Sequence, residues 1–361
     1  MNDKKISICY LADAVSPHTI KLAEYFQKRG HKIMVISFNP GVSGNVSTHY
    51  IDSGLFSSFK IKYIVGLPKL KEEIRILNPD ILHAVYATSY GFAGACLNFH
   101  PYVVSVIGSD VAIRPQDSFI FKWLVQYAIR KADAIHSQSQ HLTDRLISLG
   151  AKSDKISTFT YGIDIAAGFF LQAREFVGKG GVVISTRALE TVYNIDLLIK
   201  AIPLVLEKMP NTKLLIVGRG SLEKKLKREV EKLKIGSAVE FIGYLSYENL
   251  ANVLKKADVY VSTSLSDGQS ISLLEGMAMG VFPVVSDIEG NRNWVRNGEN
   301  GFLCSVFDPE DLAKKIIKAL SDPTLRKSAY AINKRIIEKK GSLEKNMALM
   351  ENQYFHLIKG V

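Results

Sequence analysis

Strand-like and helix-like patterns alternate along this sequence from one end to the other. Short apolar runs such as residues 6–12, 32–38 and 81–85 are each followed by a longer segment whose apolar residues recur at helical spacing. A chain that repeats strand and helix in this way buries its strands in a parallel sheet. The alternation therefore predicts an α/β fold, with helices covering both faces of the sheet.

The alternation is interrupted once, between Tyr161 and Gly181. This segment contains five glycines and has no clear periodicity, so we place a domain boundary there. We expect a first α/β domain over residues 1–165, a second over 166–342, and a last amphipathic helix within 343–361. Two such domains predict a ligand cleft between them, outside the carboxyl ends of their strands.

The composition narrows the class of protein. Of the 361 residues, 47% are hydrophobic and 22% are charged, which is typical of a globular chain. No apolar run approaches the ~20 residues of a membrane-spanning helix. The three cysteines lie far apart, which favours a reducing cytoplasm over a disulfide framework.

The net charge of +11 raises the question of an anionic partner. Lysine and arginine are spread along both halves, and we find no nucleic-acid-binding motif, so nucleic acid is disfavoured as a partner. A peripheral contact with an anionic membrane, at its inner face, is compatible with this charge.

One stretch, Ser264–Gly280, carries the strongest signal for a ligand site. It follows a strand-like run and consists of a polar loop and a helix-like segment. Gly268 permits close backbone approach, and Ser270 can cap the helix start, where free N–H groups favour a phosphate. Asp267 and Glu275 flank this point and could accept hydrogen bonds from sugar hydroxyls. An ordinary crossover with two solvated acids explains the same stretch equally well.

Other strand ends also carry candidate site residues. Arg187 follows the first strand of the second half, where a guanidinium can bind a diphosphate. Asn194 lies in the same loop. Gly218 belongs to a Gly-Arg-Gly turn that lacks the third glycine of a dinucleotide fingerprint, so hydride transfer is a weak hypothesis. His18 and Asp110 follow strands of the first half, and no histidine spacing indicates a metal.

A set of motifs, in the same order, resembles the retaining, nucleotide-sugar-dependent glycosyltransferases of family 4. The matching segments are Tyr25–Ile33, Asn78–Ala84, Gly108–Asp110, Lys131–Ile135, Tyr161–Asp164, Asp267–Glu275 and Asn297–Leu303. The resemblance covers nearly the whole chain. It implies the GT-B fold, in which two Rossmann-like domains with parallel sheets face a cleft and the last helix, here within 343–361, crosses back to the N-terminal domain.

The resemblance also implies roles for the candidate residues. Glu275 would hold the ribose, Asp267 would contact the donor sugar, and Arg187 would neutralise the diphosphate. The remaining donor-binding residues would be Gly268, Gln269, Ser270, Ile271, Asn194, Gly218, Gly243 and Tyr244. The expected catalytic residues are Asp267 and Arg187 on the donor side and His18 and Asp110 on the acceptor side, in the first domain. The family implies no metal and no cofactor, because the nucleotide-sugar is a substrate.

The sequence departs from the family pattern at four places. The first acid is Asp267, whose side chain is one methylene shorter than glutamate. The lysine that usually follows the arginine is absent, and Tyr193 and Asn194 occupy that region. Ser16–His18 replaces a glycine pair. Two family histidines are replaced by Val85 and Ile107.

The sequence therefore predicts a glycosyltransferase that moves a sugar from a nucleoside-diphosphate sugar to an acceptor hydroxyl with retention. The expected acceptor is a glycan, a lipid-linked group or a small molecule, and the expected setting is the synthesis of cell-surface polysaccharide or lipid-linked glycan. Two alternatives stay open. They are a nucleotide-sugar 2-epimerase and a non-catalytic homologue that binds a nucleotide or sugar.

Overall fold

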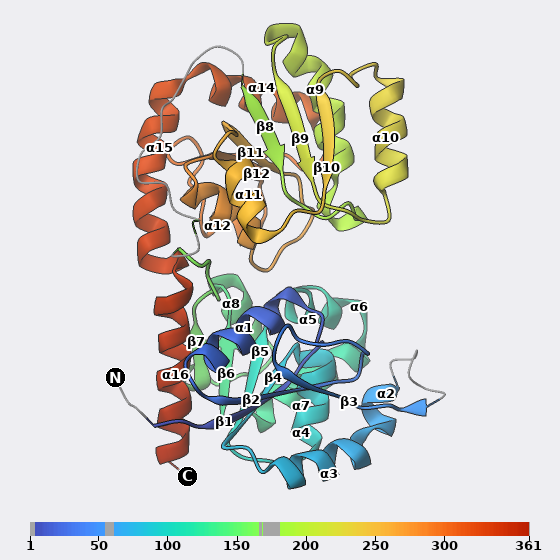
Figure 1. Ribbon diagram of the computed structural model, residues 1–361, viewed down its shortest axis with the longest axis vertical. Helices are drawn as coiled ribbons and strands as arrows, with labels where there is room; N and C mark the ends of the chain where they lie inside the picture. The colour runs from blue at the N-terminus through green and yellow to red at the C-terminus, as the bar shows by residue number, and fades with distance from the viewer. Residues whose placement is uncertain (1–3, 55–60, 166–167, 169–180, 361) are drawn as a thin grey trace. The chain divides into compact units, whose positions relative to one another are not determined.

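The structure, a computed structural model, describes residues 4–54, 61–165, 168 and 181–360 (Figure 1). The chain forms two compact units, Met1–Tyr161 with Lys345–Val361, and Gly162–Glu344. Most of the glycine-rich segment in which we placed the domain boundary lies outside the described residues. The expected bounds of the domains therefore stay a prediction.

The first unit is built on a parallel sheet of seven strands in the order β3-β2-β1-β4-β5-β6-β7. The strands are β1 (Ser7–Leu11), β2 (Lys32–Ser37), β3 (Ser47–Tyr50), β4 (Ile81–Val85), β5 (Tyr102–Val106), β6 (Ala134–Ser137) and β7 (Ile156–Thr158). Every residue of β4 and β5 is buried, as expected for central strands covered on both faces.

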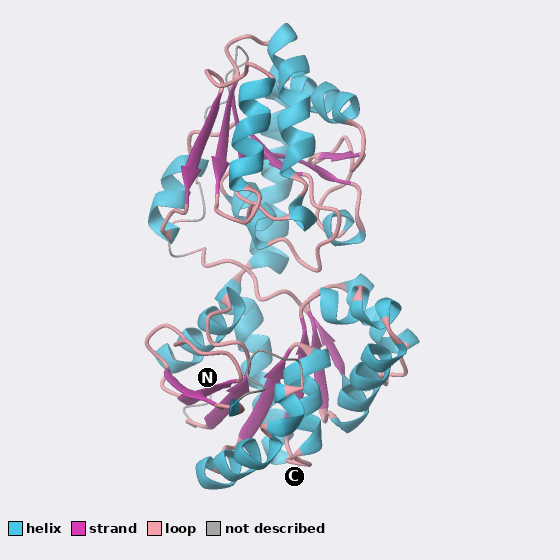
Figure 2. Cartoon of the chain, turned by 90° about the vertical axis from the view of Figure 1, so that its right-hand side faces the viewer, coloured by secondary structure: helices cyan, strands magenta, loops and turns pink. Residues whose placement is uncertain are grey.

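Helices cover both faces of this sheet (Figure 2). They are α1 (Pro17–Lys28), α2 (Lys62–Val65), α3 (Leu67–Leu77), α4 (Phe92–Cys96), α5 (Ser109–Ala112), α6 (Arg114–Asp117), α7 (Phe119–Lys131) and α8 (Gln140–Ser148), with a π-helix η2 (Ala87–Gly91) and a short 3-10 turn η3 (Ser153–Lys155). η2 and α4 follow each other directly, so the segment after β4 begins as a π-helix and continues as an α-helix.

The second unit repeats the architecture with six parallel strands in the order β10-β9-β8-β11-β12-β13. The strands are β8 (Val182–Ser185), β9 (Lys213–Val217), β10 (Val239–Gly243), β11 (Val259–Ser262), β12 (Phe282–Ser286) and β13 (Phe302–Cys304). The helices are α9 (Ile195–Lys208), α10 (Glu223–Lys232), α11 (Tyr247–Leu254), α12 (Ile271–Ala278), α13 (Glu289–Arg292), α14 (Pro309–Ser321) and α15 (Pro323–Ile336), with the short turns η4 (Thr191–Tyr193) and η5 (Ile337–Gly341).

The last helix, α16 (Leu343–Lys359), returns the chain to the first unit. Arg29 donates two hydrogen bonds to the Glu351 carboxylate, from Nε at 3.0 Å and from Nη2 at 2.8 Å. The Tyr354 hydroxyl lies 2.5 Å from Nδ1 of the buried His83. The predicted return of the C-terminal helix is thus confirmed, as is the fold class of two Rossmann-like units with parallel sheets.

Both sheets reverse their strand order at one point, between β1 and β4 in the first unit and between β8 and β11 in the second. Chains leaving the two strands at such a point diverge, and this opens a crevice at the carboxyl ends where ligands of doubly wound sheets bind. In the second unit these two chains are the loops after β8 and β11. They contain Arg187 and Asp267, respectively, so the topology brings the two residues together.

Candidate active site

The loops after β8 and β11 are held together by hydrogen bonds to backbone carbonyl oxygens. Thr263 donates its hydroxyl to the carbonyl oxygens of Tyr193, at 3.0 Å, and Asn194, at 2.8 Å. The amide of Leu265 donates to the carbonyl oxygen of Val192 at 2.8 Å. These bonds fix the two polar loops at the point where the strand order reverses, and they set the position of the side chains described next.

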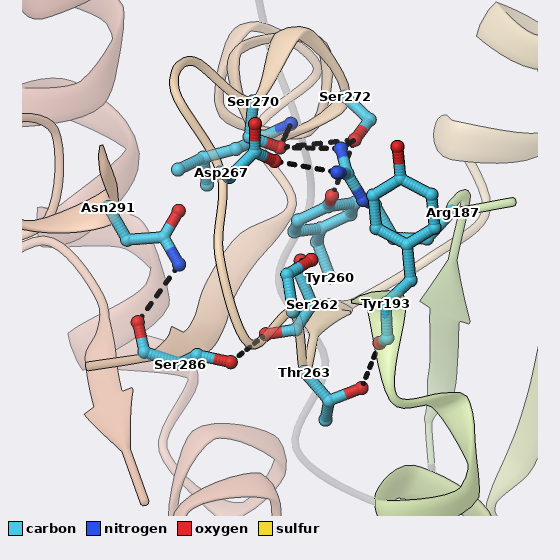
Figure 3. A network of polar contacts seen from close by, with 12 residues as sticks. Arg187, Tyr193, Tyr260, Ser262, Thr263, Asp267, Ser270, Ser272, Ser286 and Asn291 are labelled. Carbon is cyan, nitrogen blue, oxygen red and sulfur yellow. Dashed lines mark hydrogen bonds and ion pairs between the residues drawn. The ribbon is translucent and has the colours of Figure 1, made fainter. Parts of the chain in front are cut away.

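Arg187 and Asp267 form a buried ion pair between these loops (Figure 3). The distance between Arg187 Nη2 and Asp267 Oδ2 is 2.6 Å, and the two side chains are only 10% and 13% exposed. The residue predicted to bind the diphosphate and the residue predicted to contact the sugar therefore bind each other in this structure.

The other terminal nitrogen of Arg187 binds the start of helix α12. Nη1 donates to Ser270 Oγ at 3.0 Å and to Ser272 Oγ at 2.9 Å. Ser270 also caps the helix, because its hydroxyl accepts from the amide of Leu273 at 3.3 Å. A guanidinium and a helix N-terminus are both positive, so together they favour an anion. Asp267 supplies that anion here.

The Tyr193 ring packs against the Arg187 guanidinium. The Arg187 Cζ atom lies 4.2 Å from the centre of the Tyr193 ring, which is a cation–π contact. Burial acts most strongly and lowers the pKa of Arg187, but Asp267, Tyr260 and Tyr193 together outweigh it and the pKa is raised, so the guanidinium stays charged. An aromatic side chain thus stands in the region where the family pattern has a lysine.

Two glycines permit these loops to pack closely. A Cβ atom on Gly218, whose φ is +142°, would lie 2.6 Å from the carbonyl oxygen of Arg187. A Cβ atom on Gly290 would lie 2.4 Å from the carbonyl oxygen of Asp267. Real Cβ atoms do not approach so closely, so each glycine sets the path of one functional loop. The sequence indicated Gly218 but not Gly290.

Several buried polar atoms around the ion pair have no hydrogen-bond partner. They are Arg187 Nε, Thr186 Oγ1, Gln269 Nε2 and Asn291 Oδ1. The side chain of Gln269 is held by its other amide atom, because Oε1 accepts from Trp294 Nε1 at 3.0 Å. Buried polar groups are normally bonded, so this concentration is typical of a site that binds a polar ligand.

The other predicted donor-binding residues also lie in the second unit. Glu275 is buried on α12, near Tyr247, whose pKa is raised first by burial and then by the charge of Glu275. Gly268, half-buried, and Ile271, the first residue of α12, flank the Ser270 cap. Asn194 has a left-handed backbone, and its Nδ2 donates to the carbonyl oxygen of Val306 at 3.0 Å.

The two loops that carry the predicted donor-binding residues Gly218 and Gly243 are bonded to each other. The amide of Gly218 donates to the carbonyl oxygen of Gly243 at 2.8 Å. The next side chain, Tyr244, is 76% exposed. An exposed aromatic ring beside two glycines is suited to stacking on a flat ligand.

The two predicted acceptor-side residues lie in the first unit. Asp110 is fully buried, and its carboxylate accepts hydrogen bonds from the amides of Ala87 and Gly108, each at 2.9 Å. Burial raises the pKa of Asp110, while these amide bonds oppose the rise. Asp110 therefore ties the loop after β4 to the loop after β5. His18 is half-buried on α1, with its ring 5.9 Å from that of Tyr161.

Two further properties concern metals and membranes. Within residues 4–54, 61–165, 168 and 181–360, no three His, Cys, Asp or Glu side chains converge as metal ligands. Across the same ranges, none of the helices combines the length and the apolar character needed to cross a bilayer.

Comparison with known proteins identifies the family. A model of the family described as "Glycosyl transferases group 1" matches residues 169–336, and a model described as "Glycosyl transferase 4-like" matches residues 7–139. The chain belongs to the group 1 glycosyltransferases. The predicted family, the GT-B fold class and the enzyme class are thereby confirmed.

Individual glycosyltransferases resemble the chain along most of its length. An uncharacterized glycosyltransferase of Methanocaldococcus jannaschii is 28% identical over 297 residues, covering 79% of this chain and 78% of that protein. N-acetyl-alpha-D-glucosaminyl L-malate synthase of Bacillus anthracis is 23% identical over 94% of this chain and 93% of that protein. The crystal structure of Anabaena HepE in complex with UDP-glucose superposes with a TM-score of 0.79 and 17% identity, over 99% of this chain and all of that one.

Proposed function

We propose that this glycosyltransferase takes its sugar from a nucleoside-diphosphate sugar and transfers it to an acceptor hydroxyl with retention of anomeric configuration. The observation that carries the proposal is the buried Arg187–Asp267 pair at the N-terminus of α12. At this point, where ligands of such sheets bind, the guanidinium of Arg187, the hydroxyls of Ser270 and Ser272, and the N-terminal amides of α12 lie close together. The UDP-glucose complex of Anabaena HepE, a protein of the same fold, is consistent with this class of donor.

In this proposal the donor diphosphate takes the place that the Asp267 carboxylate occupies. Arg187 donates to phosphate oxygens from the same nitrogens that now bind Asp267 and the two serines. Asp267 turns away and accepts a hydrogen bond from a hydroxyl of the donor sugar. The Asp267 carboxylate thus neutralises Arg187 before the donor binds and contacts the donor sugar afterwards.

The chemistry proposed for this site is mainly electrostatic. As the bond between sugar and phosphate breaks, negative charge grows on the diphosphate, where Arg187 and the amides of Gly268 to Ile271 stabilise it. Positive charge grows on the anomeric carbon, and a leaving-phosphate oxygen takes the proton of the incoming acceptor hydroxyl on the same face. The protein contributes position and charge, and no carboxylate acts as nucleophile.

The remaining residues receive supporting roles. Glu275 accepts hydrogen bonds from the ribose. The base is bordered by Gly218, Gly243 and Tyr244. The donor loop is shaped by Gln269 and Asn194. On the acceptor side, we assign His18 to contact with the acceptor and Asp110 to positioning of the loops after β4 and β5, because its carboxylate is bonded to their amides. A lipid-linked or glycan acceptor, with peripheral contact to an anionic membrane, fits this assignment.

The test is a transfer assay with a panel of nucleotide-sugars and acceptors. We expect Arg187→Ala and Glu275→Ala each to lower transfer more than tenfold, whereas Arg228→Ala, which changes an exposed arginine of α10, leaves it unchanged. Unimpaired rates in the first two variants would refute the assignment. Conversion of the donor without any acceptor would indicate a 2-epimerase instead, and nucleotide binding with no turnover would indicate a non-catalytic homologue.

A further inference from the structure

A small pocket in the first unit has a different chemistry from the Arg187–Asp267 site. Its volume is about 200 Å³. Most of its wall is apolar and comes from α2, α4 and α7, and its polar edge follows β4. Its lining includes Ile64, Phe92, Phe121, Leu124, Tyr86 and Arg114.

The polar edge of the pocket begins at a strained residue. Tyr86 has a φ of +88° and a ψ of 104°, which a residue with a side chain rarely adopts. It lies between β4 and the π-helix η2, and its hydroxyl is 2.9 Å from Ser109 Oγ. Strained backbone and single π-helical turns both concentrate at functional sites. The position is also the carboxyl end of the strand where this sheet reverses its order, so a ligand is expected there.

The other edge of the pocket carries a cation. Arg114 is exposed, and its Cζ atom lies 5.7 Å from the centre of the Phe121 ring. The N–H groups of a guanidinium lie in its own plane. An aromatic ring against its face therefore leaves them available for a carboxylate or phosphate. The pocket therefore pairs an apolar wall with a single positive group at its edge.

The same helices expose further apolar side chains beside the pocket. Phe119 and Ile120 begin α7 and are 82% and 66% exposed. Trp123, one turn further along α7, is also exposed, and its ring packs on Phe92, which lines the pocket. Exposed apolar groups that adjoin a concave apolar site extend the surface that an apolar ligand can cover.

We propose that this pocket binds the apolar part of an anionic amphiphile, and that this amphiphile is the acceptor of the transfer reaction. The proposal rests on the function proposed above. An apolar cavity of about 150 Å³ holds one benzene molecule, so the pocket accommodates a ring or a short alkyl segment. Tyr86, Thr88 and Ser89 offer hydroxyls at the polar edge, but a bare sugar would leave most of the apolar wall without an apolar partner. The anionic group of the ligand lies at Arg114.

The first experiment measures binding of butyl, hexyl and octyl phosphate to the full chain by calorimetry, below the concentrations at which these compounds form micelles. Burial of one methylene strengthens binding about fourfold, so we expect the dissociation constant to fall by roughly that factor for each added carbon until the pocket is filled. Inorganic phosphate alone should bind at least a hundredfold more weakly than octyl phosphate. Affinity that does not change with chain length would overturn the proposal.

Three substitutions then locate the site. Ile64→Glu, at an exposed position of the pocket, should weaken octyl phosphate more than tenfold. Ile76→Glu makes the same change at an exposed position of α3 that does not line the pocket, and should have no effect. Arg114→Gln should weaken octyl phosphate and leave octyl glucoside, its uncharged counterpart, unchanged. Equal affinities in Ile64→Glu and Ile76→Glu would refute the location.

Three more measurements separate this inference from others. Octyl phosphate should inhibit transfer by competing with the acceptor and not with the donor. Binding to vesicles with 30% anionic lipid, without binding to monomeric octyl phosphate, would show surface adsorption and would overturn the pocket. A thermal shift with nucleotide-sugars reports on the second unit separately. A chain that binds nucleotide-sugars but no amphiphile refutes this inference alone, whereas the reverse result refutes the proposed function.

Discussion

Replacing Asp267 by asparagine should have opposite effects on stability and on nucleotide binding. The substitution keeps the size and shape of the side chain and removes its charge. Arg187 then loses its counterion while remaining buried at a helix N-terminus, where the positive end of the dipole disfavours it. In the proposed donor complex, however, the diphosphate no longer has to displace a carboxylate.

The size of the effect follows from the geometry of the pair. Two unit charges about 4 Å apart interact by about 4 kcal/mol at an effective dielectric constant of about 20. The cost of removing both charges from water offsets part of this attraction, and asparagine can still accept one hydrogen bond. We therefore expect the free energy of unfolding to fall by about 2 kcal/mol. UDP and inorganic pyrophosphate should bind at least five times more tightly, since the competing charge is gone.

The chain supplies a matched control. Arg292 and Asp287 form an ion pair with the same nitrogen–oxygen distance of 2.6 Å, but their side chains are 56% and 45% exposed. Asp287→Asn should change the free energy of unfolding by less than about 0.5 kcal/mol, because solvent screens exposed pairs. Urea unfolding and calorimetry with UDP measure both quantities. Equal losses of stability in the two variants, or UDP binding no tighter in Asp267→Asn, would contradict the reasoning.

Three further predictions concern other parts of the molecule. Burial lowers the pKa of His136 to about 4 and also lowers that of His83, so below the ordinary value of 6.5 the unfolded chain binds protons that the folded chain does not. Urea unfolding should therefore show that the free energy of unfolding falls by about 2 kcal/mol between pH 7 and 5 because of His136 alone. If His136→Gln left this pH dependence unchanged, the reasoning would be wrong. Tyr86→Gly should be more stable than Tyr86→Ala by about 1 kcal/mol, because only glycine relieves the positive φ, and equal melting temperatures would show that no strain is stored there. Gly290→Ala should displace the Asp267 loop and lower both UDP affinity and transfer. Gly236→Ala serves as the control, because neither glycine has a positive φ and a Cβ on Gly236 meets nothing within 4 Å.

The apolar runs over residues 6–12, 32–38 and 81–85 correctly predicted strands in the interior of the first sheet, whereas β3 and β13, each at the edge of a sheet, were not predicted. Central strands such as β4 are apolar throughout, because both of their faces are covered. β3 reads Ser-Thr-His-Tyr and alternates between exposed and half-buried residues, so it has no apolar run. β13 has only three residues. Short edge strands are defined by the neighbour to which they bond, and that information is not local in sequence.

The same distinction applies to the candidate site. Arg187 and Asp267 could be found because each follows a strand, and the carboxyl ends of parallel strands share one edge of the sheet. Their bond to each other depends on how two loops 80 residues apart in sequence pack. Gly290 follows β12 in the same way and could have been proposed from its place in the chain. Its function, to leave room for the Asp267 backbone, is visible only in three dimensions.

Two departures from the family pattern form one arrangement in the structure. Tyr193, in the region of the missing lysine, packs against the Arg187 guanidinium, and the shortened acid Asp267 reaches the same guanidinium directly. Arg187 is therefore already paired with an acid, and in the proposed donor complex the diphosphate replaces Asp267 beside it. A second cation would strengthen attraction for the diphosphate but would leave a buried positive charge without a partner in the unliganded protein, at a cost of several kcal/mol. Pairing Arg187 with Asp267 and supporting it with an aromatic ring keeps the unliganded site stable, and under the proposed function donor binding would depend on release of Asp267.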